Sequence, residues 1–265
     1  MRLLPPEAFA EVFTPLQGKR VGYIRPHGNV GDLLIEEATF QLFDGFGIDW
    51  KIQDPAGPAD VEELVFGGGG NMGTLWMPNC NWGFRTRCLQ MGPPITILPQ
   101  SFSSREDRPY HRVYVRERAS LRFCEHATLA PDLALGYECN LDIKPKRRLG
   151  ILLRKDGEGS VRRRWFCRDP AKICKRPRQY LELAARYERI VTDRLHFAIC
   201  GLIAGRDTTL LPNSYHKNAS MHETWLRDLG CNFAESVESA LAMGKRRTPR
   251  FGRTGRRGKR PARAA

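Results

Sequence analysis

The sequence has no paired cysteines and no clustered metal ligands. Its cysteines, at positions 80, 88, 124, 139, 167, 174, 200 and 231, include no Cys-x-x-Cys pair and no short Cys/His cluster. Zinc chelation is therefore not expected. Several, such as Cys200, sit in apolar runs, where cysteine behaves as a small buried hydrophobe. We expect reduced cysteines that serve packing, and no metal site.

Long apolar runs are also missing. No segment approaches the roughly 20 apolar residues that span a bilayer, and residues 1–13 lack a basic region followed by an unbroken apolar stretch. With 265 residues, 41% hydrophobic and 27% charged, the chain is long enough to bury a core and to form two small lobes. These features predict a globular, cytoplasmic protein.

Acidic residues are absent from the C-terminal segment 245–265, which carries ten Lys or Arg. Subtracting them from the formal net charge of +14 leaves about +4 for the rest of the chain. A second basic run covers 144–148 and 162–178. Blocks of like charge favour a disordered, solvated tail and a solvated loop or linker. Contact with a polyanion is the alternative.

Short apolar runs alternate along the chain with segments of helical spacing. Such alternation is typical of parallel sheets joined by crossover helices. The predicted fold class is therefore α/β, with parallel sheets in two Rossmann-like lobes. We expect strands at 21–24, 61–66, 95–98, 113–115, 149–154, 190–192 and 208–211, and helices at 33–43, 119–124, 178–187 and 197–204.

The polar stretch 140–148 predicts a linker between the lobes. We place an N-terminal lobe at 1–143, a C-terminal lobe at 144–244 and the basic tail at 245–265. Near the end of the second lobe, Ser220 and Glu223 have the spacing of a capping box for a helix that Gly230 would stop. Because ligands bind outside the carboxyl ends of parallel strands, the site should lie between the lobes.

Two glycine segments, 28–31 and 67–70, follow predicted strands. Glycines there allow backbone N–H groups to approach an anion at a helix N-terminus. The alternatives are a tight connection with Asp32 as a helix cap and a flexible turn. Neither segment matches the dinucleotide motif G-x-G-x-x-G or the lysine-bearing phosphate loop, which argues against a nucleotide cofactor.

The turn 193–196 (DRLH) places an acid, a guanidinium and an imidazole at one strand end. Arg194 can grip carboxylate or phosphate, and His196 can exchange protons near neutral pH. The alternative is a capped helix with an Asp–Arg ion pair and a core histidine. Lys217 and His216, beside Asn213 and Ser214, supply further anion donors or form an ordinary polar loop.

Seven segments in order resemble the motif series of polysaccharide pyruvyl transferases. They cover about residues 20–230, and the resemblance implies a two-lobed fold like that of GT-B glycosyltransferases, no metal and no cofactor, and phosphoenolpyruvate as co-substrate. The segments are 27–32 (HGNVGD), 66–71 (FGGGGN), 97–102 (ILPQSF), 116–120 (RERAS), 130–132 (APD), 192–196 (TDRLH) and 213–218 (NSYHKN).

The resemblance implies transfer of a pyruvyl group onto two hydroxyls of a polysaccharide or lipid-linked oligosaccharide, forming a ketal. The C-terminal lobe would bind the donor and the N-terminal lobe the acceptor. A basic tail would hold such an enzyme near anionic lipid at the inner membrane face. The assigned residues are His196, Arg194 and Asp32 for catalysis, Arg154, Asn213, Ser214 and Lys217 for the donor, and His27, Asn29, Gly69 and Asn71 for the acceptor.

Two other functions compete with this reading. A nucleotide-sugar-dependent glycosyltransferase would share the two-lobed architecture, since fold does not fix chemistry. A nucleic-acid-binding protein would depend on the tail, and its affinity would fall steeply with salt; the ordered motifs disfavour it. The chain is short for the family and carries a basic insert at 162–178, which leaves the acceptor open.

Overall fold

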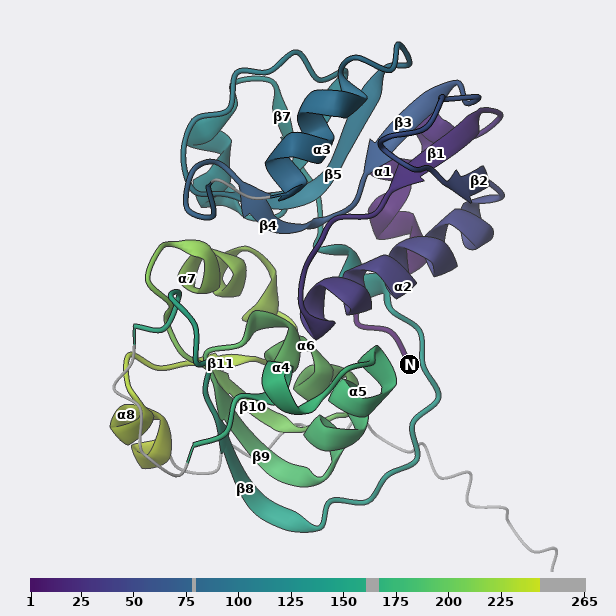
Figure 1. Cartoon of the computed structure of the whole chain (residues 1–265). Coiled ribbons are helices and arrows are strands. Elements are labelled where there is room, and N and C mark those ends of the chain that lie inside the picture. Colours follow the sequence, from purple (N-terminus) through teal and green to yellow (C-terminus); the bar gives the residue numbers. More distant parts are fainter. Residues whose placement is uncertain (78–79, 161–166, 244–265) are drawn as a thin grey trace, which may run out of the picture.

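The computed structural model describes residues 1–77, 80–160 and 167–243. Their strands form two sheets in which all neighbours run parallel. Figure 1 shows the first sheet in the upper half of the molecule and the second in the lower half. The predicted α/β fold with parallel sheets is confirmed.

The first sheet has seven described strands in the order β2-β1-β3-β5-β6-β7, with β4 beside β5. Strand β5 is buried along its whole length, as expected where both faces of a parallel sheet are covered. The strands are β1 (Arg20–Ile24), β2 (Asp49–Ile52), β3 (Glu63–Phe66), β4 (Gly69–Met72), β5 (Ile95–Phe102), β6 (Arg112–Val115) and β7 (Ala127–Leu129).

The second sheet has four described strands in the order β11-β10-β9-β8. Strand β9 pairs with β8 on one side and β10 on the other, so its carboxyl end lies at the middle of the sheet. The strands are β8 (Arg147–Leu152), β9 (Tyr187–Thr192), β10 (Asp207–Leu210) and β11 (Asn232–Phe233).

Helix α2 (Val30–Phe46) has well-defined ends. Asn29 accepts a hydrogen bond from the backbone N–H of Gly31, and Asp32 reaches back to the N–H of Asn29. Gly47 ends the helix in the left-handed conformation. The other helices are α1 (Ala10–Phe13), α3 (Cys80–Cys88), α4 (Pro170–Ile173), α5 (Pro177–Ala185), α6 (Leu195–Ile203), α7 (Lys217–Met221) and α8 (Val237–Ala242).

One hydrophobic cluster joins the two halves of the molecule. It contains Leu34 and Ala38 of α2, Leu181 of α5 and Phe197 of α6. Figure 1 shows α2 lying over α5 and α6, between the sheets. The lobe boundary at 143 and 144 therefore stays a prediction, because the largest core draws on both sides of it.

Short helical turns complete the chain. Five elements with 3-10 or π geometry are described, and the segment expected as a helix at 119–124 is one of them, a 3-10 helix. Its first residues pack on α7 and on the π-helical turn that follows it: the N–H of Ala119 donates to Ser220 Oγ, and the N–H of Arg118 donates to Thr224 Oγ1. The five are η1 (Pro6–Phe9), η2 (Thr14–Leu16), η3 (Arg118–Phe123), η4 (Leu133–Gly136) and η5 (His222–Leu226).

Two sequence-based predictions are wrong. Ser220 does not cap a helix: it lies inside α7, which begins at Lys217, and its hydroxyl accepts a hydrogen bond from the N–H of Ala119. The second glycine segment is not a strand-loop-helix turn, because β4 starts at Gly69 and pairs with β5.

Strand β2 was not predicted. The tail 245–265 and residues 162–166 of the basic insert lie outside the described residues.

Several cysteines pack as expected: Cys88, Cys167, Cys174, Cys200 and Cys231 are buried. Across 1–77, 80–160 and 167–243, no group of three His, Cys, Asp or Glu side chains is arranged to hold a metal ion. None of the helices in these ranges has the length and apolar character needed to cross a bilayer.

Candidate functional site

A polar cavity of about 180 Å³ lies where strands of the two sheets end toward each other. The first sheet contributes residues within β4 and after β1, β4 and β6, and the second contributes residues after β8, β9 and β10. This is the position predicted for a ligand site. The lining residues are Asn29, Asp32, Gly70, Asn71, Trp76, Arg116, Arg154, Asp156, Glu158, Tyr180, Arg194, Leu195, His196 and Lys217.

The imidazole of His196 contacts two residues that follow strands of the first sheet, Asp132 and Arg116. Its Nε2 atom lies 3.3 Å from Asp132 Oδ2 and 3.3 Å from Arg116 Nη1. Its Nδ1 atom faces α2 so closely that a Cβ added to Gly31 would sit 2.5 Å away. The ring is therefore held between Gly31 on one side and Asp132 with Arg116 on the other.

Asp132 and Arg116 give the imidazole a partner in either protonation state. A guanidinium only donates, so Arg116 can bond Nε2 only when that nitrogen is unprotonated. An ionised carboxylate only accepts, so Asp132 bonds Nε2 when it carries a proton. A histidine with both partners in place is suited to giving up and regaining a proton.

Asp132 stays ionised at this site. Burial alone would raise its pKa, but the charges of His196 and Arg116 outweigh burial and hold the pKa well below the usual range. Arg116 Nη1 donates to Asp132 at 2.8 Å and Arg116 Nε to Ser101 Oγ at 2.8 Å. Both Arg116 and Asp132 are 1% exposed, so the pair forms a buried ionic centre.

Arg194 is held by two carboxylates. It forms a bidentate pair with Asp169, with distances of 3.0 Å from Nε and 2.7 Å from Nη2, and Nη2 also lies 2.8 Å from Asp156 Oδ2. Asp169 caps α4 through the N–H of Ala171. The guanidinium lines the cavity but already has acidic partners, so an entering anion would share it with them.

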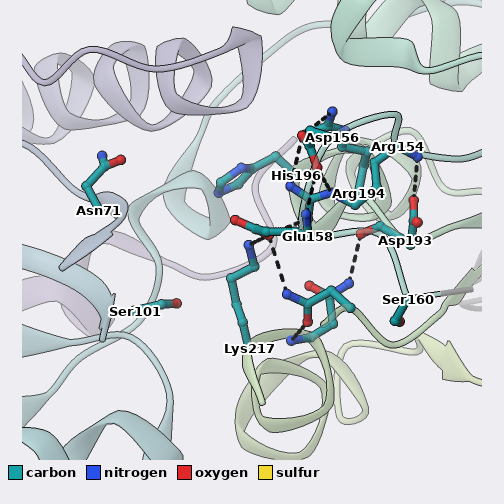
Figure 2. Close-up of polar contacts among 12 residues, drawn as sticks. Asn71, Ser101, Arg154, Asp156, Glu158, Ser160, Asp193, Arg194, His196 and Lys217 are labelled. Carbon is teal, nitrogen blue, oxygen red and sulfur yellow. Dashed lines mark hydrogen bonds and ion pairs between the residues drawn. The ribbon is translucent and has the colours of Figure 1, made fainter. Parts of the chain in front are cut away.

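Arg154 and Lys217 meet at one buried carboxylate (Figure 2). Arg154 Nη1 and Lys217 Nζ both donate to Glu158 Oε2, and Arg154 Nε donates to Asp156 Oδ1 at 2.6 Å. Burial lowers the pKa of Lys217 to about 8, although Glu158 opposes the change. Glu158 has a lowered pKa: burial would raise it, but the charges of Lys217 and Arg154 prevail.

Seven of the predicted site residues line the cavity and four do not. The side chain of Asn213 is directed at Glu158 and at the N–H of Asn218, and Ser214 is exposed. His27 is exposed, with its ring 5.1 Å from that of Phe84. Gly69 does not line the cavity, whereas its neighbour Gly70 does. The seven are Asn29, Asp32, Asn71, Arg154, Arg194, His196 and Lys217.

Five charged residues of the site were not assigned a role from the sequence: Arg116, Asp132, Asp156, Glu158 and Asp169. Arg116 and Asp132 follow β6 and β7 and stand in two of the quoted motifs, so the strand-end rule could have identified them. Asp156 and Glu158 follow β8 by the same rule. Asp169 carries no such signal, because only the fold brings it to Arg194.

Comparisons with known proteins identify the family of this chain. Residues 29–215 match the family described as "Polysaccharide pyruvyl transferase". A Bacillus subtilis (strain 168) protein named "Putative pyruvyl transferase EpsO" is 26% identical, with 76% of this chain and 83% of that protein covered.

The fold also resembles a solved structure. A crystal structure of an uncharacterised protein from Klebsiella pneumoniae subsp. pneumoniae superposes with a TM-score of 0.69 at 20% identity, covering 86% of this chain and 97% of that one. The match of 29–215 spans most of the sequence and includes the glycine, Arg116, Asp132 and His196 segments that build the cavity. The chain belongs to the polysaccharide pyruvyl transferase family.

Proposed function

We propose that the protein transfers a pyruvyl group from phosphoenolpyruvate to two hydroxyls of a carbohydrate, forming a cyclic ketal. The observation that carries this is a small cavity in which Arg116, Lys217 and His196 converge. A guanidinium and an ammonium bind carboxylate and phosphate, the two anionic groups of the donor. The imidazole supplies the proton that the chemistry requires.

The size of the cavity suits a small donor. Its volume of about 180 Å³ is below the roughly 300–1,000 Å³ of pockets that hold drug-sized ligands. Phosphoenolpyruvate is a small molecule, whereas a nucleotide sugar is considerably larger. The nucleotide-sugar alternative therefore has less support than the pyruvyl donor.

In the proposed reaction His196 delivers a proton to the methylene carbon of the donor, which leaves C2 electron-poor. One acceptor hydroxyl then bonds to C2, and a second does so as the bond from C2 to the phosphate oxygen breaks. Of the two hydroxyl protons, one replaces the proton given to carbon and the other leaves with inorganic phosphate. Asp132 and Arg116 position the imidazole throughout.

The acceptor would approach from the first sheet. Asp32 and Asn71 line that side of the cavity and can hydrogen-bond sugar hydroxyls. Trp76 also lines it and is 37% exposed, so its ring offers an apolar face for a sugar ring. Asp32 is the candidate for orienting or deprotonating the acceptor hydroxyl.

The proposal is tested with the full chain by thermal shift and by phosphate release. Phosphoenolpyruvate should raise the unfolding temperature, and phosphate should appear only when a carbohydrate acceptor from a panel is added. Trp76→Ala should reduce acceptor-dependent release while leaving the thermal shift unchanged. Stabilisation by nucleotide sugars and none by phosphoenolpyruvate would favour the glycosyltransferase alternative.

Gly31 should be needed for the placement of His196. A methyl group there would meet His196 Nδ1 at 2.5 Å, so Gly31→Ala must displace the ring. Because a shift of about 1 Å in a catalytic group can cost about 10²-fold, we expect turnover to fall by about that factor. Steady-state phosphate release measures the effect.

Gly45→Ala is the matched control, since Gly45 lies in the same helix with no atom near its Cβ position. It should leave turnover unchanged and stabilise the helix by roughly 0.5–1 kcal/mol. Equal turnover in the two variants would show that the close approach to His196 is unimportant.

A further inference from the structure

The space beside Gly70 is surrounded by hydrogen-bond donors. A Cβ built on Gly70 would lie 3.2 Å from Arg116 Nη2, 3.7 Å from Tyr215 Oη and 4.0 Å from Lys217 Nζ. The backbone of Gly70 is not in the left-handed region, so its conformation does not demand glycine. The missing side chain instead leaves room for a ligand atom among the three donors.

The hydroxyl group of Tyr215 lies beside this space without a hydrogen-bond partner among the described residues. Its Oη is buried and forms no hydrogen bond among the described residues. Burial raises the pKa of Tyr215 well above its ordinary value, so the hydroxyl keeps its proton and can donate it. Leaving a buried hydroxyl unpaired costs about 1–3 kcal/mol. A ligand that accepts from it would recover that cost.

Arg116 and Lys217 also have N–H groups for which no hydrogen bond to a described residue is found. The hydrogen bonds described for the Arg116 side chain use Nε and Nη1, so none of those formed with described residues uses Nη2. Lys217 Nζ has three donors, and the bond described for it is the one to Glu158. Tyr215 is fixed beside Lys217, whose Nζ lies 5.1 Å from the centre of its ring.

The local charge favours a monoanion. Arg116 is paired with Asp132 and Lys217 with Glu158, so the two cations are already largely neutralised. A dianionic phosphate would be poorly compensated there. A carboxylate carries one charge and two oxygens, which matches one neutral hydroxyl and two partly compensated cations.

We propose that Tyr215 Oη, Arg116 Nη2 and Lys217 Nζ, around the open position at Gly70, bind the carboxylate of the donor. The assignment rests on the proposed use of phosphoenolpyruvate. Tyr215 is then a binding residue that selects a 2-carboxylate, and Gly70 is the residue that leaves room for it.

The test measures binding of phosphoenolpyruvate, pyruvate and inorganic phosphate to the full chain by calorimetry. Tyr215→Phe should weaken the binding of phosphoenolpyruvate and of pyruvate by about 10-fold or more, because hydrogen bonds to charged groups are worth about 1.5–3 kcal/mol. Phosphate affinity should be unchanged. Without ligand the variant should be at least as stable as the wild type, since it loses an unpaired buried hydroxyl. Gly70→Ala should also weaken the binding of phosphoenolpyruvate and of pyruvate.

Tyr110→Phe is the control: Tyr110 Oη is also buried without a hydrogen bond described for it, but it belongs to another pocket, lined by Arg108 and Phe123, and not to the space beside Gly70. It should bind all three ligands as the wild type does. Unchanged phosphoenolpyruvate affinity in Tyr215→Phe would overturn the carboxylate assignment and leave the proposed function standing. Equal losses for phosphate and pyruvate would also overturn it. A wild type that binds no phosphoenolpyruvate would overturn both proposals.

Discussion

His196→Asn should lower the turnover number by about 10²–10⁴-fold, the range expected when a positioned proton donor is lost. Asparagine keeps a polar group of similar reach but cannot deliver a proton to carbon. The cations near the donor are untouched, so phosphoenolpyruvate should still raise the unfolding temperature. Single-turnover phosphate release, with the donor and an acceptor both saturating, measures the chemical step.

His126→Asn is the appropriate comparison, because His126 is exposed and outside the cavity. It should retain full activity. A His196→Asn enzyme within tenfold of the wild type would show that another group protonates the donor. Loss of the donor-induced thermal shift in that variant would instead assign His196 to binding.

Arg116→Met should lower the free energy of unfolding by about 3–5 kcal/mol, the usual cost of removing one partner of a buried ion pair. The guanidinium is 1% exposed and contacts Asp132 and Ser101. Without it, the buried carboxylates of Asp132 and the neighbouring Glu117 lose their guanidinium partner and keep the imidazoles of His196 and His216 as their basic neighbours among the described residues. Urea unfolding followed by circular dichroism measures the loss.

A double variant separates the charge effect from lost packing. Asp132→Asn removes the negative charge while keeping an oxygen that can cap η4 as Asp132 does. Combined with Arg116→Met, it should recover part of the stability, giving a coupling energy above about 1 kcal/mol. Arg105→Met is the surface comparison: its side chain is 69% exposed, and exposed ion pairs contribute about 0–1 kcal/mol. Strict additivity would contradict a coupled pair.

The alternation of apolar runs and helical segments was sufficient to predict the parallel α/β fold. It also placed the site, because polar residues at strand ends gather at one edge of a sheet. Strand β2 was missed because it has only four residues, DWKI, and three of them are exposed at the sheet edge, so a single packed side chain, Trp50, is too little to produce a pattern.

Which charged residues of the site pair with one another could not be predicted from the sequence. Arg194 was predicted to bind an anion, with an Asp–Arg ion pair as the alternative, and it is held bidentately by Asp169, 25 residues earlier in the chain. Ser220 satisfied a capping pattern but lies within a helix that starts three residues earlier. Both features depend on which segments pack together. Local spacing does not encode that choice.

The hydrophobic cluster that joins α2 to α5 and α6 has a consequence for how the protein can be divided. Since Leu34, Leu181 and Phe197 belong to one core, a cut at the linker would expose apolar surface on both fragments. The two halves are thus interdependent for folding, and neither is a module that recombination could exchange intact.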